Sequence, residues 1–588
     1  MILQSLAQYY DRLLNDPNTN IAPPGWFQGR LDYLILLKPT GDFVSVRSLK
    51  REEGKRFVGR KTILPCIGKQ AFKHANSGKD ANLLWDNSSF IFGLGNKGSL
   101  KLNSFISLID ENLTDLDDQG IDAIITFLKR GLSDPKYFHP IITDPEYGKE
   151  IESGRSNISF GLVDDEHIFV FARPKVRERI SKLDISDDSP VGVCLVSGNS
   201  NQPIELCHPV IRGIRKSNPT DPDPNYISFN EPAFVSYRKK QSANAPSSKS
   251  AVFAYTTALN YLLASQRQRM QVGDASTVFW AKDPTDFEET FCSCFEQPVK
   301  GEEAVKYDRI RSLLTAVRSG VPPEDEARPF YVLGLAPNAS RISIRFWYAG
   351  NLKEIKERMA RFFDDIEVVR SKRDPEFLSL LQLLSSTATE GKIDNLPPNV
   401  AGDFARAVMM GGNYPRTLLA NAVRRCKAEK ERVTFARVSI IKACLVRNAH
   451  FSNSNNKEVS VALDKTYGNI GYVLGRLFAV LERIQEKAQP GINKTIRDTY
   501  FGAATSSPQI TFKRLDELSI HHLAKIRNSG HSIVWYERLK QEVYDLVPAA
   551  GIPNQLSLED QARFSVGYYH QRQDFFKTKE TEVTGEEA

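Results

Sequence analysis

Positively charged side chains are concentrated in one stretch of the chain, from Arg416 to Arg447. Nine lysines and arginines fall there against two acidic residues, and this excess of seven positive charges equals the net charge of +7 of the whole chain. Cations on neighbouring helices can bind a phosphate backbone because they displace its counterions. A solvated charged surface is the alternative, although such surfaces usually intersperse both signs of charge. We therefore predict nucleic-acid contact by cations of this stretch, among them Arg416, Arg424, Arg425, Arg437, Lys442 and Arg447.

A second group of polar side chains comes just before the apolar residues Leu83, Leu84 and Trp85. Lysines can hold phosphates, and amide side chains can bond the edges of bases. The alternative for Asn82 is that it caps a turn beside Trp85. We predict a loop that contacts nucleic acid, made of Lys69, Gln70, Lys73, Asn76, Lys79 and Asn82.

The remaining motifs do not indicate an enzyme. The glycine-rich stretch from Gly93 to Gly98 lacks the spacing of a phosphate-binding loop, which favours a turn. His521 and His522 are adjacent in a predicted helix and cannot face one ligand together. Cys292 and Cys294 stand closer in sequence than the usual pair of zinc ligands. We predict no catalytic residue, no metal and no cofactor.

The elements that must position these residues change in character along the chain. Up to about residue 350, alternating apolar residues predict strands and hairpins, whereas beyond it the apolar period of 3.6 predicts helices with short connections. The predicted fold class is α+β, with an N-terminal mixed α/β region over 1–395 and an all-α helical bundle over 396–588. Strands are predicted at 31–37, 43–46, 158–163, 167–172, 191–196, 234–237, 276–280, 330–335 and 341–347, and flexible loops near 217–225 and 239–250.

The overall composition is that of a globular protein with more than one compact unit, since 588 residues are 41% hydrophobic and 25% charged. No uncharged apolar run reaches the roughly 18 residues of a membrane span, and the N-terminus does not resemble a secretion signal. Seven scattered cysteines are too few for a disulfide framework in a chain of this length. These features predict a cytoplasmic protein with reduced thiols.

Longer motifs, spread in order along the chain, match a known family. With these motifs the chain resembles, essentially end to end, the large subunit of the type I-C CRISPR Cascade surveillance complex. The motifs are Ile21 to Gly25, Asn82 to Asn87, Gly334 to Arg341, Tyr414 to Leu419, Leu474 to Glu482 and Phe564 to Arg572.

The resemblance implies a non-catalytic, prokaryotic cytoplasmic subunit for antiviral defence. It would recognise the protospacer-adjacent motif in double-stranded DNA, promote R-loop formation, hold the displaced strand and help recruit a helicase-nuclease. In such complexes base pairing with the guide reads the target, whereas protein reads the short motif and the backbone. The implied partners are the CRISPR guide RNA, the target duplex with its displaced strand, the backbone and guide-end-binding Cascade subunits, the helicase-nuclease, and a small subunit made from an internal start of the same gene.

The resemblance also assigns roles to residues. Motif recognition falls to Lys69, Gln70, Lys73 and Asn82, and contact with guide RNA or a neighbouring subunit to Arg341 and Arg345. Two other functions stay open: an RNA-binding structural subunit of another ribonucleoprotein, and a metal-dependent nuclease. Some of the residues assigned to single-stranded DNA are expected to form intramolecular ion pairs instead; the full set is Arg416, Arg424, Arg425, Arg437, Lys442, Arg447 and Arg476.

Overall fold

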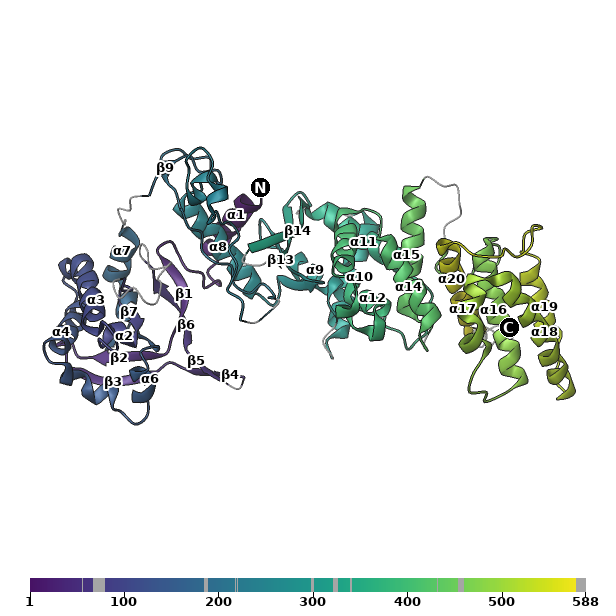
Figure 1. The fold of residues 1–588 in the computed structure, drawn as a ribbon, viewed down its shortest axis with the longest axis horizontal. Helices are drawn as coiled ribbons and strands as arrows, with labels where there is room; N and C mark the ends of the chain where they lie inside the picture. The colour runs from purple at the N-terminus through teal and green to yellow at the C-terminus, as the bar shows by residue number, and fades with distance from the viewer. Residues whose placement is uncertain are drawn as a thin grey trace, which may run out of the picture. The chain divides into compact units, whose positions relative to one another are not determined.

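The computed structural model describes residues 1–54, 56–66, 80–183, 189–216, 218, 220–297, 301–320, 326–338, 341–430, 432–452 and 459–577. It contains two compact units, which are described separately. The first holds Met1–Gly213, Thr220–Tyr261 and Ala339–Arg341, and the second holds Ile214–Pro219, Leu262–Asn338 and Ile342–Ala588. Small sheets and hairpins in the first part of the chain and helices in the last confirm the α+β class (Figure 1). The functional division at residue 395 stays a prediction.

The described part of the first unit combines a four-stranded sheet, three two-stranded sheets and helices of 4 to 16 residues. The sheet has the order β3-β2-β8-β7, in which β2 pairs antiparallel with β3 and parallel with β8. Its elements are α1 (Ile2–Asn15), β1 (Trp26–Leu31), β2 (Tyr33–Leu37), β3 (Phe43–Ser48), β4 (Arg51–Glu53), β5 (Arg56–Val58), β6 (Arg60–Pro65), β7 (Trp85–Asn87), α2 (Ser88–Ile91), α3 (Gly98–Leu113), α4 (Gln119–Ser133), α5 (His139–Ile142), α6 (Gly148–Glu152), β8 (Asn157–Leu162), α7 (Pro174–Lys182), β9 (Val191–Gly192), β10 (Gln202–Pro203) and α8 (Lys249–Ala264).

The predicted hairpin of β2 and β3 is confirmed. Its turn is closed by Lys38 N, which donates to Asp42 O at 2.9 Å. Gly41 has a φ of +81°, and a Cβ there would lie 2.7 Å from Cβ of Thr126, so only glycine fits. Strand β2 is apolar along its length because β3 and β8 flank it on both sides.

Three of the predicted strands are wrong, each for a local reason. The segment 167–172 ends in the 3-10 turn Val170–Ala172, and Arg173, directly after it, forms ion pairs with Asp118 and Asp165. Of the segment 191–196 only Val191–Gly192 is a strand, since Cys194 N turns back to Asn199 O at 2.9 Å. In the segment 234–237 a 3-10 turn, Pro232–Phe234, comes first and Tyr237 adopts a φ of 50°. Alternating apolar residues are therefore present in these segments although the backbone does not form the predicted strands.

The glycine-rich stretch 93–98 and the predicted loop 239–250 both contain turns. Gly93 and Gly95 have positive φ, and α3 begins at Gly98, whose own Cβ would lie 1.8 Å from Gly93 O. This stretch is the turn that its spacing predicted. The stretch 239–250 contains the 3-10 turn Gln241–Asn244 and buries Ser242, Ser247 and Ser248.

The second unit begins with a four-stranded antiparallel sheet and continues as packed helices. The sheet order is β11-β12-β13-β14, which confirms the predicted strands 330–335 and 341–347. Its elements are β11 (Arg269–Val272), β12 (Ala275–Ala281), α9 (Phe287–Phe295), α10 (Glu303–Ser319), β13 (Pro329–Asn338), β14 (Arg341–Asn351), α11 (Leu352–Ile366), α12 (Leu380–Thr387), α13 (Pro398–Met410), α14 (Arg416–Ala428), α15 (Phe435–Phe451), α16 (Ile470–Ala488), α17 (Ile496–Ser506), α18 (Pro508–Asn528), α19 (Val534–Tyr544) and α20 (Leu558–Lys577).

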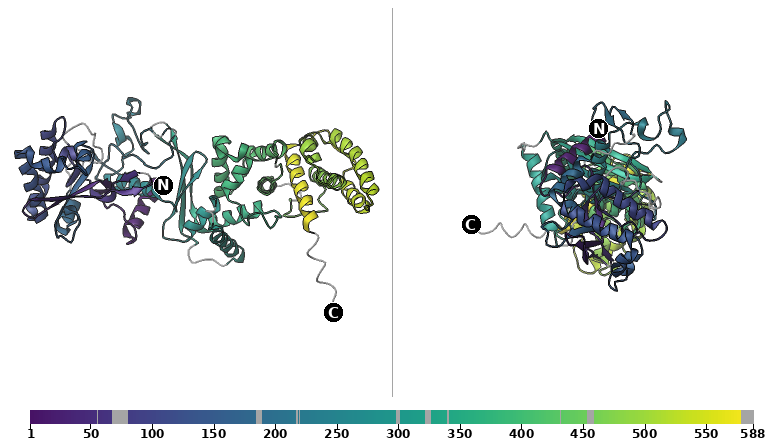
Figure 2. Two further views of the ribbon diagram at one scale, coloured as in Figure 1. Left: turned by 90° about the horizontal axis from the view of Figure 1, so that it is seen from below. Right: turned by 90° about the vertical axis from the view of Figure 1, so that its left-hand side faces the viewer.

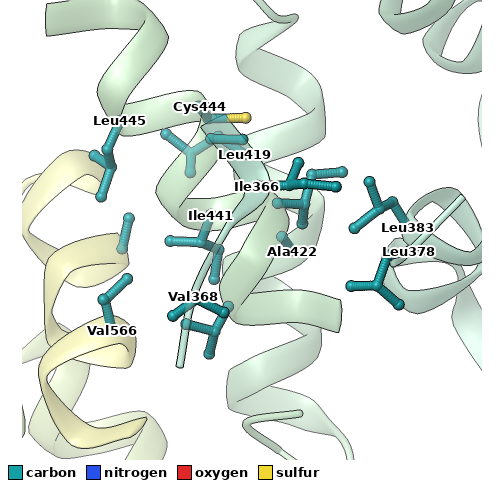
Figure 3. Close-up of a cluster of buried hydrophobic side chains, with 14 of the residues drawn as sticks. Ile366, Val368, Leu378, Leu383, Leu419, Ala422, Ile441, Cys444, Leu445 and Val566 are labelled. Carbon is teal, nitrogen blue, oxygen red and sulfur yellow. The ribbon is translucent and has the colours of Figure 1, made fainter. Parts of the chain in front are cut away.

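A continuous apolar core joins these helices. Figure 3 shows Ile366, Leu419, Ile441 and Val566 brought together from α11, α14, α15 and α20. Figure 2 shows α20, in yellow, lying against the other helices of its unit. Helix α15 is buried on nearly every side, as expected of a helix that is surrounded by others.

Helices α16 and α20 approach one another unusually closely. A Cβ at Gly475 would lie 2.0 Å from Phe564 O, and one at Gly567 would lie 2.2 Å from Tyr472 O. Glycine is therefore required on both helices, because any side chain would push the two backbones apart. Arg476 and Glu482 of α16 are buried on this packed helix.

Candidate nucleic-acid interface

Helix α14 presents a cationic surface because its apolar residues form one stripe. Leu418, Leu419, Ala422, Val423 and Cys426 are buried, and the side chains opposite them face water. Two of the predicted contact residues, Arg416 and Arg424, lie on this exposed side. The side chain of Arg416 is 74% exposed and stands 3.3 Å from Glu559.

Arg424 is exposed on α14 and has no hydrogen bond or ion pair to any other residue that the structure describes. Arg425 is half-buried, with its guanidinium 3.4 Å from Oε1 of Glu429. Lys427 donates to Oε1 of Gln561 at 3.3 Å, and burial lowers its pKa. The cationic surface of α14 therefore rests on Arg416 and Arg424, with Arg425 at its edge.

The cations of α15 are held inside the fold. Arg437 is buried, donates from Nε to Ser386 O at 2.8 Å and forms an ion pair with Glu429. Lys442 is buried as well, and its Nζ donates to the carbonyls of Asp364 and Asp365 at 3.1 and 3.0 Å. A cation at the last carbonyls of a helix is favourable, so Lys442 stabilises the C-terminal end of α11.

Arg447 belongs to a buried network. Its Nε donates to Oδ2 of Asp365 at 2.8 Å, and its second amino group donates to the hydroxyl of Tyr414 at 2.8 Å. The Tyr414 hydroxyl donates in turn to Asp365 Oδ2 at 2.9 Å, and burial next to Asp365 raises the pKa of Tyr414. The guanidinium also lies 4.5 Å above the Tyr414 ring. This network fixes α15 to α11.

Arg476, the last predicted single-strand contact, is also buried. Its Nε donates to Oε1 of Gln571 at 3.1 Å, and a second nitrogen donates to Lys465 O at 3.2 Å. Burial lowers its pKa. Four of the predicted contact residues therefore present almost no surface to a phosphate in this structure, because they are buried between packed helices. They are Arg437, Lys442, Arg447 and Arg476.

Asn82 is 5% exposed in this structure. Its backbone N–H donates to Oδ2 of Asp86 at 2.8 Å, so the turn is held by the carboxylate of Asp86. Burial leaves the amide of Asn82 little surface for a base edge. The other three residues assigned to motif recognition, Lys69, Gln70 and Lys73, lie outside the described residues.

The described residues on both sides of 67–79 are firmly anchored. Cys66 N donates to Gly25 O at 2.8 Å. The indole N–H of Trp85 donates to Pro65 O at 2.9 Å, and its ring lies 5.4 Å from that of Phe27. The apolar residues 83–85, read in the sequence as an anchor, are buried.

The two arginines assigned to RNA or subunit contact bind different partners within the fold. Arg341 stacks over Phe234 at 4.5 Å and donates to Oδ1 of Asn230 at 3.3 Å. Arg345 donates from Nε to Oδ2 of Asp274 at 3.0 Å and keeps 45% of its side chain exposed. Arg345 thus retains a surface for a partner on the outside of its ion pair.

Sequence reasoning missed a second cationic group, in the segment from Arg47 to Lys61. Seven lysines and arginines stand there against two glutamates within 15 residues. Arg47, Arg51 and Lys61 are exposed. The local charge excess of 47–61 is the signal in the sequence that indicates this group.

Within the described ranges, no group of three or more His, Cys, Asp or Glu side chains is arranged to hold a metal ion. Cys292 and Cys294 lie on α9, and burial raises the pKa of each thiol to about 12. None of the helices that the structure describes is long and apolar enough to cross a membrane.

Comparison with known proteins identifies the class of the chain. A family model described as CRISPR-associated protein (Cas_Csd1) matches residues 6–576. The chain therefore belongs to this family of CRISPR-associated proteins, and membership supports a Cascade-type subunit. No curated protein matches the chain.

Proposed function

We propose that the chain is the large subunit of a type I-C Cascade complex. In this role it recognises the protospacer-adjacent motif in duplex DNA, promotes R-loop formation and holds the displaced strand. The observation that carries the proposal is the family match over residues 6–576, which spans both compact units. The subunit itself is non-catalytic, and a separate helicase-nuclease cuts the DNA.

Strand holding is assigned to the exposed cations of α14. Arg416 and Arg424 stand on the side of the helix that faces away from the core, and Arg425 flanks them. Exposed arginines can follow a single-stranded backbone by neutralising phosphates. The buried cations of α15 and α16 serve the fold in this proposal.

Motif reading is assigned to Lys69, Gln70 and Lys73 in the first unit. Support comes from their chemistry, since lysines hold phosphates and an amide can bond a base edge. It also comes from the described residues on either side of 67–79, since hydrogen bonds from Cys66 to Gly25 O and from Trp85 to Pro65 O hold both in the fold.

The strand-holding role is tested with the double variant Arg416→Ala/Arg424→Ala in the assembled guide-RNA complex. Each lost contact to single-stranded DNA should lower the slope of log Kobs against log[salt] by roughly 0.7, so the double variant should lose roughly 1.4. The matched control is Lys513→Ala/Arg538→Ala, which removes two exposed cations from α18 and α19. An equal effect of both variants, or of neither, would refute the assignment to α14.

Motif reading is tested separately with Gln70→Ala. Binding to duplexes that differ only in the motif should lose its preference, while the affinity for a motif-free duplex stays unchanged. If the preference survives in Gln70→Ala and in Lys69→Ala/Lys73→Ala, motif reading lies elsewhere in the complex.

A further inference from the structure

The hairpin of β4 and β5 projects from the first unit. In the sequence it comes between β3 and β6. Its two strands are antiparallel, and Arg51 pairs with Val58 and Glu52 with Phe57. Figure 1 shows it continuing from β6 beyond the sheet that contains β2 and β3. We call this hairpin, together with the exposed Lys61 at its base, the arm.

The base of the arm is fixed by several contacts. Lys50 forms an ion pair with Glu150 and lies 5.1 Å above the Tyr33 ring, and the Tyr33 hydroxyl donates to Glu150 at 2.6 Å. The bonds from Lys50 and Tyr33 lower the pKa of Glu150. On the other strand, Arg30 donates to Gly59 O at 3.1 Å. The arm therefore extends from a rigid support.

Gly59 is required where the arm joins the ribbon of β1 and β6. A Cβ at this position would lie 2.6 Å from Leu31 O and 2.7 Å from Oδ1 of Asp32. The close approach of the two backbones sets the direction in which the arm leaves the unit.

The surface of the arm is both cationic and aromatic. Phe57 is 72% exposed, although it is the largest apolar side chain of the hairpin. Arg51 and Lys61 are exposed and have no ion pair with any other residue in the described ranges. A two-stranded hairpin has no core of its own, so the Phe57 ring stays on the surface, beside the cations of the arm, where a partner can contact it.

The chemistry of the arm favours nucleic acid over protein as that partner. The cores of protein interfaces are depleted of charged residues, whereas the segment 47–61 carries seven cations against two acids. A two-stranded β-ribbon fits the major groove of DNA, and aromatic side chains stack on bases or wedge between them.

We infer that the arm is a second nucleic-acid-binding element, in which Arg51 and Lys61 contact the phosphate backbone and Phe57 contacts a sugar or base. This inference deepens the proposed function, on which it rests for the identity of the complex. The phosphate backbone belongs either to target duplex or to guide RNA, and the binding assays below distinguish the two.

The first test is Arg51→Ala/Lys61→Ala in the full chain and in the assembled complex, with separate measurements on a labelled duplex and on guide RNA. On duplex DNA the slope of log Kobs against log[salt] should fall by roughly 1.8, because each lost phosphate contact removes roughly 0.9. On guide RNA a comparable loss would assign the arm to the guide instead. The matched control, Lys136→Ala/Lys175→Ala, removes two exposed cations from the same unit and should change neither slope.

This result is distinguishable from failure of the proposed function. The arm variant should weaken motif-bearing and motif-free duplexes equally, so the ratio of their affinities stays constant. Unchanged binding of both nucleic acids would overturn the inference, whatever the outcome for motif reading.

The second test does not depend on affinity. A photo-crosslinking amino acid in place of Phe57 should join the arm to labelled nucleic acid in the assembled complex. The same amino acid in place of Tyr237, which is 94% exposed in the same unit, is the control and should not. A crosslink from position 57 to a protein subunit alone would show that the arm is a subunit contact.

Discussion

At the scale of single residues, burial decides what an arginine of this chain does. Arg424 and Arg447 both belong to the cationic stretch 416–447, but Arg424 faces water and Arg447 is bonded to Asp365 and Tyr414. The first can bind and release a phosphate. The second cannot leave its partners without leaving the buried carboxylate of Asp365 without a counter-charge.

Arg447→Met should therefore destabilise the second unit. Removing one member of a buried ion pair leaves the other uncompensated, at a cost of about 3–5 kcal/mol in the free energy of unfolding. Arg424→Met makes the same change on the exposed side of α14 and should stay within about 0.5 kcal/mol. Urea unfolding of both variants measures the difference, and equal stabilities would contradict the assignment of Arg447 to the fold.

His208 should make the first unit sensitive to acid. Burial lowers its pKa from 6.5 to about 4, and its Nδ1 is hydrogen-bonded to the hydroxyl of Tyr255. Between pH 6.5 and about pH 4 the imidazole is protonated in the unfolded chain but not in the folded one, so the free energy of unfolding falls as the pH falls. The loss from pH 7 to pH 5 should be about 2 kcal/mol.

His208→Gln keeps a neutral hydrogen-bonding side chain beside Tyr255 and removes the titration. Unfolding of the native chain and of the variant at pH 7 and pH 5 compares their pH dependence. The difference between them should be close to the whole of that loss. If both lose stability equally, another group carries the acid sensitivity.

At the scale of elements, close packing of α16 on α20 depends on glycine. Gly475→Ala would bring a methyl group to about 2.0 Å from Phe564 O, so the helices must separate. We expect a loss of about 1–3 kcal/mol in the free energy of unfolding, as for overpacked cores.

Gly402→Ala is the matched control for that change. Gly402 lies inside α13, and a Cβ there meets nothing within 4 Å. Alanine favours helix over glycine by about 1 kcal/mol, so this variant should be slightly more stable. Thermal unfolding that ranks the two variants in the opposite order would contradict the packing of α16 against α20.

Much of the helical part of the fold follows from its sequence pattern. Periodic apolar residues predict helices at about 415–430, 434–447, 468–488 and 557–575, which the structure confirms as α14, α15, α16 and α20, because each buries at least one apolar stripe. Helix α17 has no predicted counterpart, although Thr495 and Asp498 form a capping box at its start, in which Thr495 N donates to Asp498 Oδ2 at 2.9 Å. The failed strand at 167–172 shows the limit of apolar alternation, which does not distinguish a strand from the 3-10 turn Val170–Ala172.

The candidate site was less predictable, because its residues were chosen by charge alone. The apolar residues on both sides of Lys442, from Val438 to Leu445, were the signal that this part of α15 would be buried. The arm lacked such a signal in periodicity, and only the local charge excess of 47–61 marks it.

At the scale of the whole molecule, exposed cations occur in both compact units. Arg51 and Lys61 lie in the first, and Arg416 and Arg424 lie in the second. We expect the two pairs to contribute separately to binding. The variant that lacks all four should therefore lose the sum of the two separate reductions in salt slope, and a smaller loss in a salt titration of the quadruple variant would show that the pairs contact the same phosphates.

The most direct test of the central proposal is motif discrimination by the reconstituted guide-RNA complex, with and without this chain. The duplexes are identical in the guide-matched region and differ only in the flanking motif. We expect a preference for the motif only when the chain is present, together with opening of the duplex next to the motif. An equal preference in the complex that lacks the chain would contradict the proposal that this chain recognises the motif.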